Sequence, residues 1–181
     1  ENDITSESIF SSEQKCTATL IAKEEGVLAG LAVIEELKKQ TGSLFTYTIH
    51  KQEGDTFQNK DTLINLEGSL IVILRIERIL LNFLQYLSGI ATEANKISKK
   101  YENKLLIFDT RKTLPGYRKL VKYAVYIGGA CNHRQNLSDM ALIKDNHVAM
   151  SGSIKEAVSK VRNKFPNKKV ELEIDGLHQL D

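Results

Sequence analysis

From Lys104 onward, short apolar runs alternate with helix-like segments, and this alternation restricts the possible folds more than any other feature of the sequence. The pattern predicts strands at 105–108, 140–143 and 170–174, with helices at 117–125 and 154–165. Strands about thirty residues apart with helices between them are typical of βαβ units in a parallel sheet. Three strands cannot close a barrel, so if this sheet belongs to one, the chain carries about half of it and leaves an exposed edge.

The first part of the sequence has a mixed pattern, which predicts a small α+β domain. Residues 17–22 are β-like and residues 29–39 are helix-like. Residues 45–49 alternate between apolar and polar side chains, as in a half-buried strand. Glycines at 54–55 and 67–68 indicate turns between the elements of this domain.

One amphipathic helix separates the two patterns. Its apolar residues recur with the spacing of a single helical stripe, and they are Ile76, Ile79, Leu80, Phe83, Leu84 and Leu87. Gly89 is a plausible end for this helix, and residues 92–101 read as a second, more polar helix. The stripe predicts that one face of the helix is buried in the core.

Basic residues and an imidazole follow predicted strands or a glycine pair at three places: Arg111, Lys112, His133, Arg134 and Lys144. In a parallel sheet or barrel, the carboxyl ends of the strands carry the functional residues. Arginine suits bidentate recognition of carboxylate or phosphate, and lysine suits phosphate as a point charge. The arrangement predicts a pocket for a ligand with several negative charges. A solvated basic pair at 111–112 and a structural histidine at 133 remain the alternatives.

Two further groups are candidates. Glu171, Glu173 and Asp175 alternate with apolar residues, which is also the pattern of a strand with one wet face. In a parallel barrel, a carboxylate near the end of that strand would face the pocket and stabilise a developing cation. Arg78 and Asn82 lie one turn apart on the polar face of the long helix, where they are either solvent-exposed or part of a site across a domain or subunit boundary.

Composition excludes several classes of function. The chain has 181 residues, of which 41% are hydrophobic, and its formal net charge is only +2, so no global field favours nucleic acid. The two cysteines are too few for a disulfide framework. No signal peptide and no apolar run long enough for a bilayer is seen, so we expect a cytoplasmic protein without a membrane partner. No P-loop, dinucleotide fingerprint or metal-ligand cluster is present.

An ordered set of motifs resembles the quinolinate phosphoribosyltransferase family. The motifs are Glu77-Arg78-Ile79-Leu80-Leu81-Asn82-Phe83-Leu84-Gln85, Leu87-Ser88-Gly89-Ile90-Ala91-Thr92, Asp109-Thr110-Arg111-Lys112-Thr113-Leu114-Pro115, Lys122-Tyr123-Ala124-Val125, Asn132-His133-Arg134, Leu142-Ile143-Lys144-Asp145-Asn146-His147 and Glu171-Leu172-Glu173. Asp3-Ile4-Thr5 and residues 25–30 also resemble amino-terminal signatures of that family. A long series of motifs in family order is far more specific than any one of them.

The resemblance implies an α/β fold, in which a small amino-terminal α/β sandwich domain precedes the first part of an incomplete parallel α/β barrel. We expect the sandwich and its connecting helices at 1–103 and the first βα units of the barrel at 104–181, with the carboxyl-terminal remainder absent and both ends cut. The implied reaction joins quinolinate to 5-phosphoribosyl 1-pyrophosphate, with Mg²⁺, and gives nicotinate mononucleotide, pyrophosphate and carbon dioxide in NAD biosynthesis. The implied assembly is a homodimer or a larger homo-oligomer with shared sites.

The resemblance also implies roles for single residues. Arg111, His133 and Arg134 would hold the quinolinate carboxylates, while Lys112 and Lys144 would bridge quinolinate and the phosphoribosyl donor. Glu173 would stabilise the oxocarbenium character of the ribose, which makes Lys112, Lys144 and Glu173 the expected catalytic residues. Arg78 would reach into the neighbouring subunit's site.

Three positions depart from the family pattern, namely Tyr126, Ala130 and Asn136. Tyr126 stands where a basic residue is common, which bears on ligand affinity. Two other functions stay open at this point. One is a related phosphoribosyltransferase for nicotinate or another small acid, and the other is a non-catalytic fragment that only dimerises or binds a partner.

Overall fold

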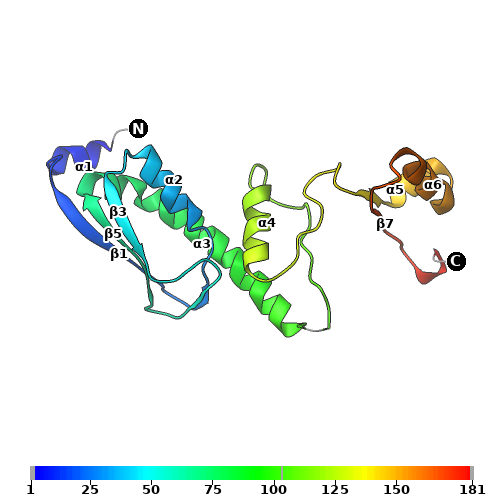
Figure 1. The fold of residues 1–181 in the computed structure, drawn as a ribbon, viewed down its shortest axis with the longest axis horizontal. Coiled ribbons are helices and arrows are strands. Elements are labelled where there is room, and N and C mark those ends of the chain that lie inside the picture. The colour runs from blue at the N-terminus through cyan, green and yellow to red at the C-terminus, as the bar shows by residue number, and fades with distance from the viewer. Residues whose placement is uncertain (1–2, 103, 180–181) are drawn as a thin grey trace. The chain divides into compact units, whose positions relative to one another are not determined.

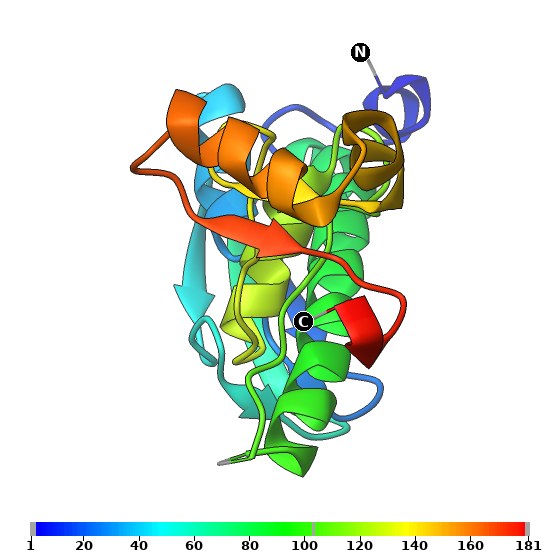
Figure 2. The ribbon, with the colours of Figure 1, turned by 90° about the vertical axis from the view of Figure 1, so that its right-hand side faces the viewer.

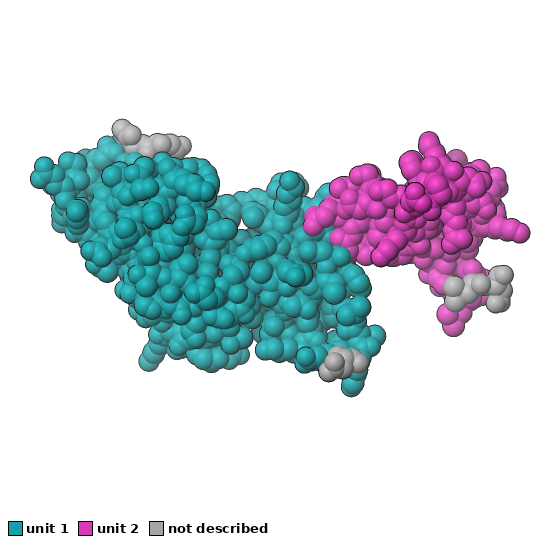
Figure 3. Space-filling model, viewed as in Figure 1, with its two compact units in different colours: residues 1–109, 113–132 teal, residues 110–112, 133–181 magenta. Residues whose placement is uncertain are grey.

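The computed structural model describes residues 3–102 and 104–179. They form two compact units, residues 1–109 with 113–132 and residues 110–112 with 133–181 (Figure 3). The domain boundary that we expect between 103 and 104 falls on residue 103, outside the described residues, and stays a prediction.

The first unit begins with a three-stranded antiparallel sheet in the order β1-β5-β3 (Figure 1). Its elements, with the helices and short strands around them, are α1 (Ile4–Ile9), β1 (Lys15–Ile21), β2 (Gly26–Val27), α2 (Ala32–Gln40), β3 (Phe45–Ile49), β4 (Thr56–Phe57), β5 (Thr62–Ser69), α3 (Leu70–Lys100) and α4 (Arg118–Ile127). Apolar side chains of α2 and α3 pack with the inward-facing residues of the sheet, such as Phe45 and Ile64. The predicted strands at 17–22 and 45–49 are confirmed, and the unit contains the expected α/β sandwich.

The predicted helix at 29–39 begins later than expected. Gly30 has a left-handed backbone with φ of 108°, which no helix can include, and α2 starts at Ala32. The side chain of Glu53 accepts the backbone N–H groups of Gly30 and Leu31 at 2.7 and 2.9 Å. One carboxylate therefore satisfies donors that the start of the helix leaves without a partner.

The turn predicted at 67–68 is wrong, because both residues lie inside β5. Gly68 pairs with Cys16 on one side and with Phe45 on the other. A Cβ at this position would lie 2.4 Å from the carbonyl oxygen of Leu44 and 2.6 Å from the Cα of Phe45. This glycine therefore serves the close approach of a neighbouring strand rather than a turn.

Helix α3 is a single helix of 31 residues, so the predicted break at Gly89 is wrong. Four members of the predicted stripe are buried, namely Ile76, Leu80, Leu84 and Leu87, whereas Ile79 is 47% exposed. Gly89 lies on the exposed side, where its cost in helix propensity is about 1 kcal/mol. Buried residues on both sides of Gly89 offset that cost, and the helix continues through it.

Helix α4 packs on the second half of α3. Gly128, just after α4, permits this close approach, because a Cβ there would lie 2.3 Å from the carbonyl oxygen of Ala91. Asn95 of α3 donates to the carbonyl oxygen of Gly128 at 3.1 Å. The result is a small second core in which Leu87 and Ala91 meet Ala124.

The predicted strand at 105–108 is reduced to one bridge, a parallel pairing of Phe108 with Cys131. A strand needs a partner along its whole length, and in the described residues only the end of this segment has one. Leu105 and Leu106 are 62% and 76% exposed. The parallel direction of the bridge nevertheless agrees with the predicted βα units.

The second unit contains β6 (Ala141–Ile143), α5 (Asp145–Ser151), α6 (Ile154–Lys164), β7 (Val170–Leu172) and the short 3-10 helix η1 (Leu177–Gln179). Strands β6 and β7 pair in parallel, with Leu142 opposite Glu171. Helix α6 contacts both strands and lies beside β7 (Figure 2). These elements form a βαβ unit of the usual length, as the sequence predicts. Strand β7 ends two residues earlier than expected, and the sequence does not predict α5.

The chain is therefore a mixed α/β protein with an amino-terminal α/β sandwich and parallel βα elements after it. The described residues form no closed barrel. Among these residues, no helix is both long enough and apolar enough to cross a membrane.

Two glycine-to-alanine substitutions should change stability in opposite directions. Gly68→Ala places a methyl group against the backbone of residues 44–45, and we expect it to lower the free energy of unfolding by about 1–3 kcal/mol or more. Gly89→Ala meets nothing within 4 Å, and we expect it to raise the free energy of unfolding by about 0.5–1 kcal/mol through helix propensity. Urea unfolding of both variants measures the difference, and a neutral Gly68→Ala would contradict the close approach.

Candidate functional site

The carboxyl end of the β6–β7 pair brings two predicted catalytic residues into contact. Lys144 directly follows β6, and its Nζ lies 3.3 Å from Oε2 of Glu173, which directly follows β7. The backbone N–H of Glu173 donates to the carbonyl oxygen of Ile143 at 2.9 Å, which extends the pairing by one residue. The parallel register therefore sets the lysine beside the carboxylate.

A second polar contact involves a carboxylate of β7 itself. Nε2 of His133 lies 2.9 Å from Oε2 of Glu171. Glu171 and Glu173 are two residues apart in extended chain, so their side chains lie on the same face. The structure thus gathers His133, Lys144 and the two glutamates at one end of one short parallel sheet.

Arg134 closes the loop that leads into β6. Its Nη1 donates to the carbonyl oxygen of Met140 at 3.2 Å. Within this loop, Oδ2 of Asp139 accepts the backbone N–H groups of Gln135 and Asn136 at 2.7 and 3.3 Å. The N–H of Gln135 is the largest of the interactions that hold the pKa of Asp139 below its ordinary value of 3.8.

Arg111 and Lys112 belong to the same compact unit as these residues. Nε of Arg111 is shielded from solvent and has no hydrogen-bond partner in the described part of the chain. A buried guanidinium N–H without a partner costs free energy that an anionic ligand would recover. Lys112 is exposed, and its backbone N–H donates to Oγ1 of Thr110 at 3.1 Å.

Arg78 belongs to the other compact unit, where it lies on the exposed face of α3. Its role in a neighbouring subunit's site stays a prediction. Close to it on the helix, a groove of about 420 Å³ has apolar and aromatic walls, and its lining residues are Ile79, Asn82, Phe83, Tyr86, Leu114 and Tyr117.

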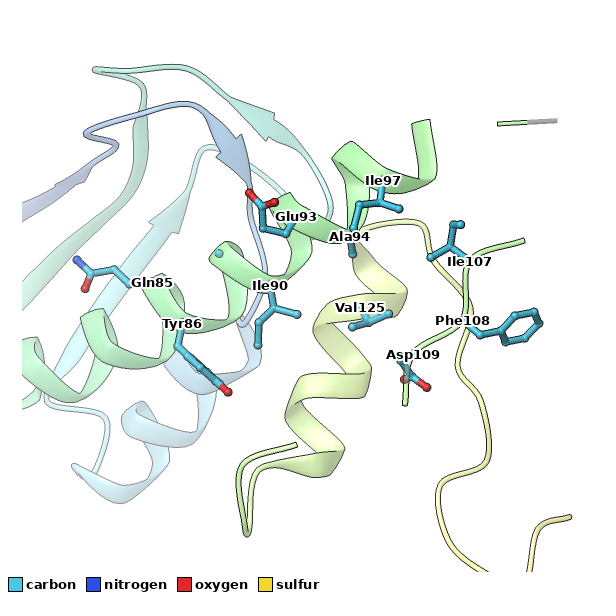
Figure 4. Close-up of a pocket in the computed structure, with 11 residues that line it drawn as sticks. Gln85, Tyr86, Ile90, Glu93, Ala94, Ile97, Ile107, Phe108, Asp109 and Val125 are labelled. Atoms are coloured by element: carbon cyan, nitrogen blue, oxygen red, sulfur yellow. The ribbon is translucent and has the colours of Figure 1, made fainter. Parts of the chain in front are cut away.

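A pocket of about 700 Å³ in the first unit does not suit an anionic ligand (Figure 4). It lies between α3, residues 107–109 and α4, and apolar residues such as Ile90, Ile97 and Val125 form most of its wall. Its ionisable side chains are the carboxylates of Glu93 and Asp109 and the phenol of Tyr86, and no cation lines it. The candidate site is therefore the basic cluster of the second unit.

The sequence does not predict the contacts that hold this cluster in place. Glu171 is one of three alternating carboxylates that it offers as candidates, but the pairing of Glu171 with His133 has no signature in local sequence. Asp139 was not singled out, although an aspartate that closes a short polar loop is a common turn device. The start of α5 was also missed, where Nδ1 of His147 accepts the backbone N–H of Lys144 at 3.0 Å.

The arrangement is suited to binding an anion with several charges. The side chains of Lys144 and Glu173 are 44% and 61% exposed, and such exposed ion pairs contribute only about 0–1 kcal/mol. A phosphate or carboxylate can therefore replace the glutamate as the partner of the lysine at little cost. Arginine and lysine donors on neighbouring loops then supply charge-assisted hydrogen bonds to the ligand.

Removal of the Asp139 carboxylate should loosen the loop after Arg134. In Asp139→Ala we expect the amide protons of Gln135 and Asn136 to exchange with solvent faster, because their acceptor is gone. The amide of Gln58, which donates to Asp61 at 3.0 Å in a similar turn, is the internal control and should not change. Amide exchange measured by NMR gives both values in one sample.

The same contact has a defined pH dependence. Because the pKa of Asp139 is lower in the folded chain than its ordinary 3.8, the contact stabilises the fold above that value and is lost as the pH falls through the folded-state pKa. The difference in stability between the parent and Asp139→Ala should shrink in that acidic range. A difference that is unchanged at all pH values would contradict a charged acceptor.

Comparison with known proteins shows the family of the chain. Residues 3–88 match the sequence model described as quinolinate phosphoribosyl transferase, N-terminal domain, and residues 90–181 match the one described as the C-terminal domain. A probable nicotinate-nucleotide pyrophosphorylase [carboxylating] of Bacillus subtilis is 42% identical over 98% of this chain and 62% of the relative. The nicotinate-nucleotide pyrophosphorylase [carboxylating] of Mycobacterium leprae is 39% identical over 99% of this chain and 64% of the relative.

A solved structure has the same fold. The crystal structure of NadC from Streptococcus pyogenes superposes with a TM-score of 0.94 at 38% identity and covers 99% of this chain. The chain spans 64% of that protein and 62–64% of the two relatives above. Both domain matches, the sequence relatives and the structural neighbour agree, and the chain belongs to the quinolinate phosphoribosyl transferase family.

Proposed function

We propose that the full-length protein transfers the phosphoribosyl group of 5-phosphoribosyl 1-pyrophosphate to quinolinate and releases carbon dioxide, which is a step of NAD biosynthesis. The relatives named above are nicotinate-nucleotide pyrophosphorylases [carboxylating], which is the same reaction class. The observation that carries the proposal is the basic cluster at the carboxyl end of β6–β7, where Lys144 contacts Glu173 and His133 contacts Glu171.

The chemistry of quinolinate fits this cluster. Quinolinate carries two carboxylates, and we assign their binding to Arg111, His133 and Arg134. The donor carries a monophosphate and a diphosphate, and we assign Lys112 and Lys144 to the region where the two substrates meet. The buried and unpartnered Nε of Arg111 supports an anionic ligand there.

In the first step the ring nitrogen of quinolinate attacks the anomeric carbon as its bond to pyrophosphate breaks. The ribose gains oxocarbenium character in the transition state, and the carboxylate of Glu173 is suited to stabilise it. Lys144 then neutralises charge on the phosphate side, so that the two partners of one ion pair act on opposite charges of the same transition state. Positioning and charge stabilisation account for the catalysis, without a covalent enzyme intermediate.

In the second step the carboxylate next to the ring nitrogen leaves as carbon dioxide. The ribosylated nitrogen is positively charged and stabilises the electron pair left on the neighbouring ring carbon. That carbon takes up a proton, which completes nicotinate mononucleotide. No residue is required to carry the electron pair.

We propose that Mg²⁺ enters with the diphosphate of the donor. Magnesium takes oxygen ligands and is usually held by one or two carboxylates together with substrate phosphates. The carboxylates of Glu171 and Glu173, which contact His133 and Lys144, would supply oxygen donors. Within residues 3–102 and 104–179 no group of three or more His, Cys, Asp or Glu residues is suited to a metal ion, so the phosphates would supply most ligands.

We also propose a homodimer or larger homo-oligomer in which Arg78 completes the site of a neighbouring subunit. Arg78 is exposed, next to Ile79, which is 47% exposed and lines the groove described above. An exposed apolar groove of this kind favours a protein partner. A cation beside such an interface is positioned to reach an anionic ligand bound by the partner.

The test is a reaction of full-length protein with carboxyl-labelled quinolinate, 5-phosphoribosyl 1-pyrophosphate and Mg²⁺. We expect labelled carbon dioxide and nicotinate mononucleotide in equal amounts. Nicotinate in place of quinolinate is the control for the related phosphoribosyltransferase. Turnover of nicotinate without turnover of quinolinate would replace the proposed substrate, and turnover of neither would leave a binding or structural role.

Arg134→Ala should weaken quinolinate binding while the protein stays folded. Loss of a charge-assisted hydrogen bond costs about 1.5–3 kcal/mol, which is roughly ten- to a hundredfold in affinity. Calorimetric titration with quinolinate measures the change, and a thermal melt checks the fold, because Arg134 also donates to Met140. Arg162→Ala, an exposed arginine on α6, is the matched control and should bind as the parent does.

Mixed subunits test the role of Arg78. Arg78→Ala and Arg134→Ala homodimers should each have little activity, whereas heterodimers formed from the two contain one site without either lesion. We therefore expect partial activity to return on mixing. If subunits exchange, as native mass spectrometry can show, and activity does not return, then Arg78 acts within its own chain or has no role in catalysis.

A further inference from the structure

A buried ion pair in the first compact unit has no role in the chemistry described so far. The side chain of Lys122, on α4, is 0% exposed, and its Nζ contacts Oδ1 of Asp109, whose side chain is 5% exposed. Lys122 is the charged residue among the buried residues of the described chain. Burying two charges is costly, and apolar residues of similar size often stabilise a fold equally well or better. Stability alone therefore does not explain this pair.

The amide of Asn132 is the third member of the group. With its nitrogen turned toward the two acceptors that it faces, it donates to Oδ2 of Asp109 at 2.7 Å and to the carbonyl oxygen of Lys122 at 2.8 Å. Both oxygens of the Asp109 carboxylate are then bonded. We call Asp109, Lys122 and Asn132 the Asp109 triad.

Backbone hydrogen bonds join the same two segments. The N–H of Asp109 donates to the carbonyl oxygen of Cys131 at 3.0 Å, and the N–H of Cys131 donates to that of Ile107 at 2.7 Å. The triad therefore links three pieces of chain, namely the end of residues 107–109, helix α4, and residues 131–132. Backbone hydrogen bonds and side-chain contacts both hold residues 107–109 next to residues 131–132.

Helix α4 is itself anchored at the next residue. Tyr123 forms a side-chain hydrogen bond with Glu53, the carboxylate that also accepts the N–H groups of Gly30 and Leu31. Burial and this hydrogen bond raise the pKa of Tyr123. The helix that carries Lys122 is therefore also held to the sandwich by the hydrogen bond of Tyr123 with Glu53.

The two basic segments begin one residue beyond the triad. Asp109 is followed by Thr110-Arg111-Lys112, and Asn132 is followed by His133-Arg134. Neither the aspartate nor the asparagine has to touch a ligand to matter, because each fixes the point from which a ligand-binding segment starts. Errors of about 1 Å in such positions can cost about a hundredfold in rate.

We propose that Asp109, Lys122 and Asn132 are positioning residues that set the spacing between the Arg111-Lys112 segment and the His133-Arg134 segment, and so favour an acceptor with two carboxylates over one with a single carboxylate. This proposal rests on the proposed function. It concerns selectivity, which a purely structural ion pair would not control.

The test uses the full-length protein and replaces the charged pair as a unit. Asp109→Leu combined with Lys122→Met removes both charges and leaves no buried charge unpaired, so we expect the fold to survive. Lys122→Met alone leaves a buried carboxylate without the ammonium group that neutralises its charge, so this single variant is not used. Lys119→Met, an exposed lysine on the same helix, is the matched control.

The measured quantities are the dissociation constants of quinolinate and nicotinate, together with the melting temperature. For the double variant we expect quinolinate affinity to fall about tenfold or more, nicotinate affinity to change much less, and Lys119→Met to behave as the parent. Asn132→Ala changes an exposed residue without burying a charge, and we expect a smaller loss of selectivity in the same direction. If the double variant fails to fold, the ratio of quinolinate to nicotinate affinity in Asn132→Ala tests the positioning role.

The outcomes separate this proposal from the proposed function. A parent protein that does not bind quinolinate would overturn the function itself. A parent that binds quinolinate, with folded variants that keep its selectivity, would overturn the positioning role and leave the function intact. A parallel loss of both affinities that follows the loss of melting temperature would show that the triad is structural only.

Discussion

The burial of one face of α3 is the constraint on which the first compact unit depends. The amino-terminal half of this helix supplies Ile76, Leu80 and Leu84 to the core under the sheet. Its carboxyl-terminal half supplies Leu87 and Ala91 to the smaller core with α4. One continuous helix of 31 residues contributes to both cores. The position of α4, which carries Lys122, is therefore fixed relative to the sandwich through α3.

The candidate site of the second unit uses charge in a different way from the ion pair of the first unit. At the carboxyl end of β6–β7, the ion pair of Lys144 and Glu173 is exposed and holds its members only weakly, so a ligand can replace one partner. In the Asp109 triad, the ion pair of Lys122 and Asp109 is buried, and both oxygens of the carboxylate are hydrogen-bonded. A lysine–carboxylate pair can thus exchange one partner for a ligand where it is exposed, and it fixes the geometry of the chain where it is buried.

Local pattern predicted the elements whose burial follows a simple period. The alternation at 45–49 is confirmed, and four of the six members of the apolar stripe of α3 are buried as predicted. The helices predicted at 117–125 and 154–165 are found at Arg118–Ile127 and Ile154–Lys164. Pattern failed where tertiary contact overrides a local signal. Gly89 reads as a helix end but lies on an exposed side of a helix that packing holds together, and Gly68 reads as a turn but accommodates the backbone of residues 44–45.

The sequence predicts the cations of the candidate site but not the contacts that those cations make. Arg111, Arg134 and Lys144 stand out because charge directly after a strand or a loop glycine is unusual in a core. The contacts of Glu171 with His133 and of Asp109 with Lys122 join residues far apart in sequence, and only the parallel register and the packing of α4 bring them together. Family resemblance named the cations and Glu173, whereas the geometry shows that Lys144 contacts Glu173 and that His133 contacts Glu171.

The order of strands in the first sheet has a consequence for folding kinetics. The central strand β5 pairs with β3, about twenty residues earlier, and with β1, about fifty residues earlier. Closing the longer loop costs more chain entropy, and non-local pairing of this kind slows folding. We therefore expect the β3–β5 hairpin and α3, which follows β5 without a break, to form first and to serve as the template on which β1 docks last.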